Sequence, residues 1–206
     1  PSLADAPQMK HTFVYPSALH HLGQACALVW KAKGYEILVG LDTDSAAIQK
    51  LAHTVVFPRA FRGYYKEINW LVDEAFEHGA DLVTVGGDDQ FPPEQGAQWV
   101  TDAYFSRWPS GDGVMQAAGD KQGSPINGLH NAARICGSPT FGQNWMKYAY
   151  HCGPFHDGYF SFFADEDLWN FAKLHNRLSL HFDITIDHAH WSFGRAVRQP
   201  YHEAAQ

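Results

Sequence analysis

The first half of the chain alternates short apolar runs with longer stretches whose apolar residues recur at helical spacing. In the stretch 65–78, for example, Ile68, Leu71 and Ala75 fall on one face of a helix. Glycine or proline follows several of these segments and ends them. The pattern predicts strands over 12–15, 35–41, 53–57 and 81–85, and helices over 18–33, 45–52 and 65–78.

The second half is less regular, and segments rich in glycine, serine, proline and asparagine separate its apolar stretches. Near its end, Phe182, Ile184 and Ile186 alternate with Asp183 and Thr185, as in a half-buried strand. No internal repeat or linker is found, so the chain 1–206 is expected to form one domain, with 1–8 as a flexible lead or a remnant of cloning. The predicted elements here are helices over 96–108, 144–150 and 165–175, strands over 113–118 and 180–186, and loops within 119–142.

Strands at this spacing, joined by helices, are typical of parallel β-α-β units. We therefore predict an α/β fold in which helices cover both faces of a central sheet, a three-layer α/β/α sandwich. In open sheets of this kind, ligands bind in the crevice outside the carboxyl ends of the strands. Residues that directly follow the predicted strands are thus the first candidates for chemistry.

Two adjacent acids follow the strand predicted over 81–85, where Gly86 and Gly87 lead into Asp88 and Asp89. Adjacent carboxylates repel each other, and a cation compensates that repulsion. Mg²⁺ and Mn²⁺ prefer oxygen ligands, and Mg²⁺ is usually held by one or two carboxylates together with substrate phosphates. The segment therefore indicates a metal–diphosphate site at a strand end, with an Asp-rich turn before a helix as the alternative.

Composition narrows the classes of function. The net charge of −7 gives no broad electrostatic footprint for nucleic acid, although a local basic groove is compatible with it. The 3 cysteines lack C-x-x-C spacing, which argues against a disulfide framework and a thiolate zinc site and fits a reducing cytoplasm. No signal peptide is recognised, and no apolar run approaches the roughly 18 residues that a membrane span needs.

A second acidic cluster, Asp165, Glu166 and Asp167, opens the helix predicted over 165–175. Acids at a helix start cap free N–H groups and complement the helix dipole, which explains such a cluster without any chemistry. The cluster also follows a glycine-rich, aromatic loop over 153–159. A carboxylate beside a pocket there would be able to take a proton from an attacking hydroxyl as a general base.

Two further segments carry candidate chemistry. His188 and His190 are two residues apart, so on a strand they share one face and form either a metal ligand pair or ordinary backbone contacts. Arg59, Arg62 and Lys66 precede or open the helix predicted over 65–78. They would either neutralise phosphate or remain solvated surface charge.

Taken together, these segments resemble the nucleotide-sugar glycosyltransferases with the GT-A fold, the large inverting family that includes many bacterial and phage enzymes. The resemblance runs from about 12 to 191, is strongest to phage-type members, and implies a Rossmann-like GT-A sheet that is mixed and mainly parallel. The acid pair has the reduced D-D form of the family's D-x-D motif, and Ala164 stands where the family has Glu before its base. The matching positions are Pro16 and Ser17 after the first strand, Asp42 after the second, Gly63 and Asn69 at the third helix, Asp88 and Asp89 after the fourth strand, 164–168 for the motif of the base, and His188 or His190 for a late metal ligand.

The resemblance implies metal-dependent transfer of a sugar from a nucleoside-diphosphate sugar, preferably a UDP-sugar, to an acceptor hydroxyl with inversion at the anomeric carbon. It assigns Mn²⁺ or Mg²⁺ to Asp89, with Asp88 nearby and His190 or His188 completing the shell. The donor is expected to contact Pro16, Asp42, Arg62, Asn69 and Asp88.

Asp165 is the first choice for the base that deprotonates the acceptor, with Glu166 and Asp167 as alternatives. The acceptor is expected to be a glycan hydroxyl or a modified phage DNA base, and the acidic net charge disfavours nucleic acid. The implied compartment is the cytoplasm of a bacterium or of a phage-infected host.

Two rival functions fit the same kind of sheet. A nucleotidyltransferase would also use strand-end acids and Mg²⁺, but such enzymes usually carry a glycine-rich, basic phosphate loop after the first strand. Here 15–21 reads Tyr-Pro-Ser-Ala-Leu-His-His. A non-catalytic nucleotide-sugar-binding module would keep the donor site without turnover.

Overall fold

The computed structural model describes residues 9–57, 62–118, 135–151 and 153–189. Its strands are β1 (His11–Ser17), β2 (Glu36–Leu41), β3 (His53–Val56), β4 (Leu82–Val85), β5 (Gln90–Phe91), β6 (Val114–Ala118), β7 (Pro139–Gly142), β8 (Leu178–Thr185) and β9 (Asp187–His188). Its helices are α1 (His20–Ala32), α2 (Ala46–Gln49), α3 (Tyr64–Glu77), α4 (Gly96–Arg107) and α5 (Ala164–Leu174), with a 3-10 helix η3 (Gln143–Lys147).

Seven strands form one sheet in the order β3-β2-β1-β4-β7-β6-β8, and β5 and β9 form a separate two-stranded sheet. The pairs β1–β2, β2–β3, β1–β4 and β6–β8 are parallel. Strand β7 is antiparallel to both of its neighbours, β4 and β6. The predicted mixed, mainly parallel sheet is therefore confirmed.

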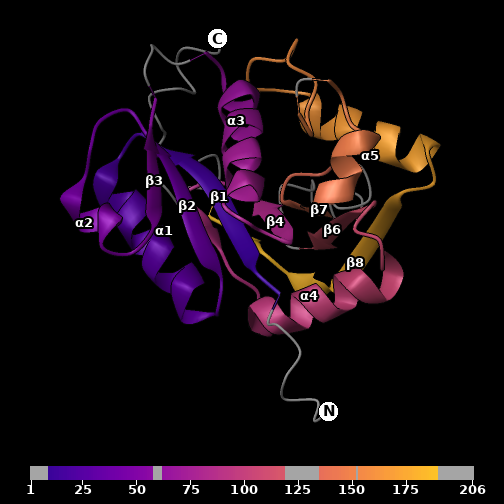
Figure 1. The fold of residues 1–206 in the computed structure, drawn as a ribbon, viewed down its shortest axis with the longest axis horizontal. Coiled ribbons are helices and arrows are strands. Elements are labelled where there is room, and N and C mark those ends of the chain that lie inside the picture. Colours follow the sequence, from indigo (N-terminus) through magenta and orange to yellow (C-terminus); the bar gives the residue numbers. More distant parts are fainter. Residues whose placement is uncertain (1–8, 58–61, 119–134, 152, 190–206) are drawn as a thin grey trace.

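Helices cover both faces of this sheet, which confirms the predicted three layers (Figure 1). Side chains alternate along β1, so Val14 packs with α3 and α5 in one core, while Phe13 and Tyr15 pack with α1, α2 and α4 in the other. Every residue of β1 is buried. Continuous burial of this kind is characteristic of central parallel strands.

An aromatic stack fixes helix α1 to the segment after β4. The rings of Phe13 and Trp30 are stacked with centroids 3.6 Å apart and planes 3° apart. The Trp30 indole N–H also donates a hydrogen bond of 2.9 Å to the backbone oxygen of Gln90, the first residue of β5. Trp30, held by the stack, therefore fixes through its indole hydrogen bond the chain directly beyond the acid pair.

Hydrogen-bonded polar side chains connect α4 with the neighbouring strands β1, β4 and β7 in the core. Thr101 donates to the Ala97 carbonyl, so its oxygen accepts from Nδ1 of His11 at 3.0 Å. Nε2 of His11 then accepts from Thr84 at 2.7 Å, and Thr84 accepts from Thr140 at 2.6 Å. Burial lowers the pKa of His11 to about 3, which keeps the imidazole neutral as this arrangement requires.

Strand β1 continues through Pro16 and Ser17, which were expected to close it. The backbone N–H and C=O groups of residues 14 and 16 are directed toward β4, as the hydrogen bond from the Gly86 N–H to the Val14 carbonyl shows. Strand β4 ends at Val85, so the missing N–H of Pro16 removes no hydrogen bond from the sheet.

The segment 119–142, in which loops were expected, also supplies β7 to the middle of the sheet. The expected lead 1–8 and most of that loop segment, 119–134, lie outside the described residues. Within the described residues, no helix has the length and apolar character to cross a bilayer.

Candidate functional site

A tight turn after β4 delivers the acid pair to the carboxyl ends of β1 and β4. The Gly86 N–H donates to the Val14 carbonyl at 3.0 Å, and the Gly86 carbonyl accepts from the Tyr64 hydroxyl at 2.8 Å. A Cβ atom on Gly86 would overlap Gln90 Oε1 and the ring of Phe13, so only glycine fits. This close packing determines where the next residues of the turn lie.

Asp88 is buried and directed toward the end of β1. Its Oδ2 accepts a hydrogen bond of 2.6 Å from the Ser17 hydroxyl, and only 7% of the residue is exposed. Its pKa is raised from 3.8 to about 7, with burial as the largest cause. The Ser17 hydrogen bond opposes the shift, and the negative charge of Asp89 adds to it. A bound cation would favour full ionisation of this carboxyl.

Asp89 lies beside His188, although the two residues are far apart in the sequence. The Asp89 Oδ2 and His188 Nε2 atoms are 3.3 Å apart, and both side chains are nearly buried. The β5–β9 pairing sets His188 opposite Gln90, and the Ala189 N–H donates to the Asp89 carbonyl at 2.8 Å. Adjacent ligands of an octahedral ion lie about 3 Å apart, so this pair fits one metal ion. His190 lies outside the described residues.

The second acidic cluster opens α5, and its three members have different surroundings. Asp165 is partly buried, and the Cys136 N–H donates to its backbone oxygen at 3.0 Å. Glu166 is exposed. The Asp167 carboxylate accepts a hydrogen bond of 2.6 Å from the Tyr150 hydroxyl. Asp165 is thus the partly buried member of the cluster that is hydrogen-bonded to the buried Tyr65.

Tyr64 connects the two acidic motifs. Burial raises the pKa of its hydroxyl well above the usual range, and the charges of Asp89, Asp88 and Asp165 raise it further. Burial likewise raises the pKa of the neighbouring Tyr65, with the Asp165 charge as the next cause. The structure therefore brings the strand-end acids and Asp165 within electrostatic reach of one phenol.

Two of the remaining predicted donor contacts lie at strand ends, and two are bound to other groups of the protein. Pro16 is buried in β1, and Asp42 is exposed directly after β2, at the same end of the sheet as the acid pair. Arg62 and Asn69 are engaged by other parts of the protein. Arg62 pairs with the buried Glu67 at 3.1 Å.

Asn69 clamps the backbone of the segment before α5. Its amide N–H donates to the Phe155 carbonyl at 2.7 Å, and its Oδ1 accepts from the Phe155 N–H at 3.0 Å. Gly153 approaches the Asn69 side chain closely, with a φ of +130°. Asn69 therefore joins α3 to the segment that leads to Asp165.

Two contributions were missed from the sequence. Neither Tyr64, which touches the turn of the acid pair, nor the hydrogen bond between Ser17 and Asp88 was expected. The sequence signal available for Tyr64 was the glycine before it, Gly63. In the structure Gly63 has a φ of +111° and lies directly before the first residue of α3. A Cβ atom on Gly63 would overlap Phe160, so this helix start lies close against the segment before α5.

No known protein-family model and no curated protein sequence matches the chain. Among solved structures, A197 from STIV has a TM-score of 0.49 at 14% identity, over 87% of this chain and 85% of that chain. A glycosyltransferase involved in the glycosylation of the major capsid of PBCV-1 has a TM-score of 0.49 at 7% identity, over 84% and 82%. UDP-glucose pyrophosphorylase complexed with UDP-glucose has a TM-score of 0.49 at 8% identity, over 87% and 92%. At such identities the similarity concerns the fold alone.

Proposed function

We propose that the protein is a metal-dependent, inverting glycosyltransferase that moves a sugar from a nucleoside-diphosphate sugar to an acceptor hydroxyl. The observation that carries the proposal is that two adjacent tyrosines of α3 contact both acidic motifs. Tyr64 donates to the turn that carries Asp88 and Asp89, and Tyr65 is hydrogen-bonded to Asp165. These acids lie at the carboxyl ends of β1 and β4 and at the start of α5. Ligands of open α/β sheets bind at this end of the strands.

Asp89 and His188 are the proposed metal ligands, with Asp88 beside them. Their 3.3 Å separation suits two ligands of one ion, and the buried Asp88 carboxyl gains from a nearby cation. Carboxylates combined with one imidazole favour Mn²⁺ over Mg²⁺. A bound divalent ion would neutralise the charge that develops on the leaving diphosphate.

Asp165 is the proposed general base. The acceptor oxygen forms a bond to the anomeric carbon, the bond from that carbon to the diphosphate oxygen breaks, and the acceptor proton passes to Asp165. Glu166 is exposed. Asp165 is preferred within the cluster because its charge acts on Tyr64, whose hydroxyl contacts the turn of the acid pair.

Asp42 and Pro16, at the ends of β2 and β1, are the proposed contacts to the nucleoside part of the donor. Arg62 and Asn69 are proposed to support the site without contacting the donor, because their polar atoms bind Glu67 and the Phe155 backbone. They support α3, which carries Tyr64. The proposed donor is a UDP-sugar, and the acceptor is a glycan hydroxyl rather than a nucleic acid.

The test measures donor binding and transfer separately. Thermal stability is recorded against a panel of nucleoside diphosphates and their sugars with and without Mn²⁺, and a ligand at 100 times its dissociation constant adds about 2.7 kcal/mol. A Mn²⁺-dependent shift that Asp89→Ala abolishes is expected. The absence of any shift with Mn²⁺ present would contradict the donor site.

Transfer to the acceptor hydroxyl is followed with Asp165→Asn and Glu166→Gln, adjacent residues of one helical turn. Asp165→Asn should keep donor binding and lose turnover by about 10²–10⁴-fold, while Glu166→Gln keeps both. Normal turnover of Asp165→Asn would remove it from the mechanism. Pyrophosphate release from a nucleoside triphosphate would identify a nucleotidyltransferase instead, and donor binding without turnover would identify a binding module.

A further inference from the structure

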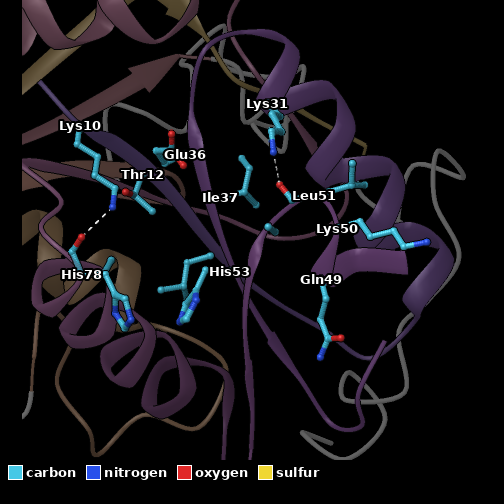
Figure 2. A pocket seen from close by; sticks show the side chains of 13 residues that line it. Lys10, Thr12, Lys31, Glu36, Ile37, Gln49, Lys50, Leu51, His53 and His78 are labelled. Atoms are coloured by element: carbon cyan, nitrogen blue, oxygen red, sulfur yellow. Dashed lines mark hydrogen bonds between the residues drawn. The ribbon is translucent and has the colours of Figure 1, made fainter. Parts of the chain in front are cut away.

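A second concave region lies at the opposite end of the sheet, where β1, β2 and β3 begin. It is a cavity of about 360 Å³, lined by residues from these strands and from α2 and α3. Figure 2 shows the rings of His53 and His78 next to each other at its margin. Their ring centroids are 4.2 Å apart. This region shares no residue with the acid pair or with Asp165.

Three metal-ligating side chains meet at this margin. His53 begins β3, while Glu74 and His78 are four residues apart on one face of α3 and at its end. One ligand atom from each of the three lies within 4.8 Å of the other two, and within the described residues they form the one such group. A helix thus supplies two ligands and the neighbouring strand supplies the third.

Hydrogen bonds already orient the two helical ligands. Nδ1 of His78 lies 2.8 Å from the Glu74 backbone oxygen and 3.9 Å from Oε2 of the same residue. The carbonyl only accepts, so Nδ1 carries the proton, and Nε2 holds the lone pair that a metal ion would use once the ring turns toward it. The Trp70 indole N–H donates to Oε1 of Glu74 at 3.1 Å. Contacts of this type, which fix the tautomer of a histidine and hold a carboxylate, accompany metal ligands in proteins.

We propose that His53, Glu74 and His78 bind a transition-metal ion of the Zn²⁺ class and that this ion ties β3 to α3. Two imidazoles and one carboxylate are a common three-ligand set for Zn²⁺, with water in the fourth position. Ligand bonds near 2.0–2.2 Å require the three atoms to approach one another, and these partly exposed side chains have room to turn. Among the described residues, β3 is an edge strand that pairs with β2 alone, so a cross-link to α3 would hold it from a second element.

The ligand chemistry separates this site from the one at the carboxyl ends. Imidazole nitrogens suit Zn²⁺, Cu²⁺ and Ni²⁺, whereas Mg²⁺ and Mn²⁺ prefer oxygen. The site at the carboxyl ends has two carboxylates and one imidazole, whereas this one has two imidazoles and one carboxylate. The imidazole-rich set is therefore expected to bind Zn²⁺ in preference to Mn²⁺. The proposal does not depend on glycosyl transfer, and its failure would leave the proposed function unchanged.

The test titrates the full chain, freed of metal with a chelator, with Zn²⁺ by calorimetry and follows its thermal unfolding. One Zn²⁺ per chain and a higher melting temperature are expected. His53→Gln and His78→Gln should each abolish that binding event. His175→Gln is the matched control, because His175 also lies exposed directly after the last residue of a helix, α5. Trp70→Phe removes the indole hydrogen bond to Glu74 while keeping an aromatic ring beside Phe57 and Arg62, and it should weaken Zn²⁺ binding by about 10–100-fold.

Three outcomes would overturn the proposal: no Zn²⁺ binding by the native chain, unchanged binding in both His53→Gln and His78→Gln, or an equal loss in His175→Gln. His53→Gln leaves the hydrogen bond at the end of α3 intact, so it stays informative if His78→Gln fails to fold. Donor and Mn²⁺ binding should be the same in His53→Gln and the native chain.

Discussion

The Ser17 hydroxyl donates a hydrogen bond of 2.6 Å to Oδ2 of Asp88 and so joins the carboxyl ends of β1 and β4. Both residues are buried, and the two strands are parallel neighbours. The hydrogen bond favours the ionised carboxylate, while burial favours the protonated acid and prevails, since the pKa of Asp88 rises to about 7. Asp88 is thus held in place as a group whose charge depends on pH and on a nearby cation.

Asp88→Asn is expected to stabilise the metal-free protein at high pH. The folded pKa lies above the unfolded one, so the contribution of protonated Asp88 is complete below pH 3.8 and is lost as pH rises through about 7. Asparagine avoids that loss and retains an acceptor for Ser17. The gain in unfolding free energy should be near zero at low pH and reach up to about 4 kcal/mol above pH 7.

Denaturant unfolding with chelator present, repeated across this pH range, measures the difference. Asp157→Asn serves as control, because it makes the same Asp-to-Asn change at a carboxylate that is 57% exposed instead of buried. Parallel stability curves for Asp88→Asn and the native chain would contradict the raised pKa.

Tyr64→Phe is expected to affect the acid pair more than the fold. The change removes the hydrogen bond of 2.8 Å to the Gly86 carbonyl, a loss of about 1 kcal/mol in unfolding free energy. Because that carbonyl begins the turn that carries Asp88 and Asp89, Mn²⁺-dependent donor binding should weaken as well.

Calorimetry with Mn²⁺ and a nucleoside diphosphate, together with thermal unfolding, measures both effects of Tyr64→Phe. Tyr65→Phe is the matched control, since the pKa of this adjacent tyrosine responds to Asp165 and not to the acid pair. Equal donor affinity in Tyr64→Phe and the native chain would show that the turn holds without the hydroxyl.

Arg62→Ala is expected to destabilise the protein by about 2 kcal/mol, because it leaves Glu67 with a buried, poorly compensated charge. The Glu67 side chain is 1% exposed and that of Arg62 is 40% exposed. The double variant Arg62→Ala/Glu67→Gln should recover most of the loss. A fall in donor affinity with unchanged unfolding free energy would instead return Arg62 to a phosphate-binding role.

The first-half elements were predicted to within a few residues, because each is a self-contained strand or helix with its own terminator. The helix expected over 65–78 is α3, Tyr64–Glu77, and the strand expected over 81–85 is β4, Leu82–Val85. Strand β7 was not predictable in the same way. Its four residues begin with a proline and end with a glycine. It is held by pairing with β4 and β6 and by the hydroxyl contact between Thr84 and Thr140.

In the candidate site, too, the residues with a local sequence pattern were predicted and the long-range contacts were not. Adjacent acids after a strand can be recognised locally, and Asp88, Asp89 and Asp165 remain the predicted functional residues. The contact of Tyr64 with Gly86 joins segments that are distant in the sequence and have no shared local pattern. The same holds for the group formed by His53 with α3. Such contacts depend on tertiary packing, which hydrophobic periodicity does not encode.

The position of β7 between β4 and β6 has a consequence for synthesis of the protein on the ribosome. The strands β1 to β4 and the helices between them emerge first and can assemble as a half-sheet. The free side of β4 then waits for β7, which emerges only after α4 and β6. Over that interval the nascent chain presents an unpaired, apolar strand edge, the kind of surface on which chains aggregate and chaperones act.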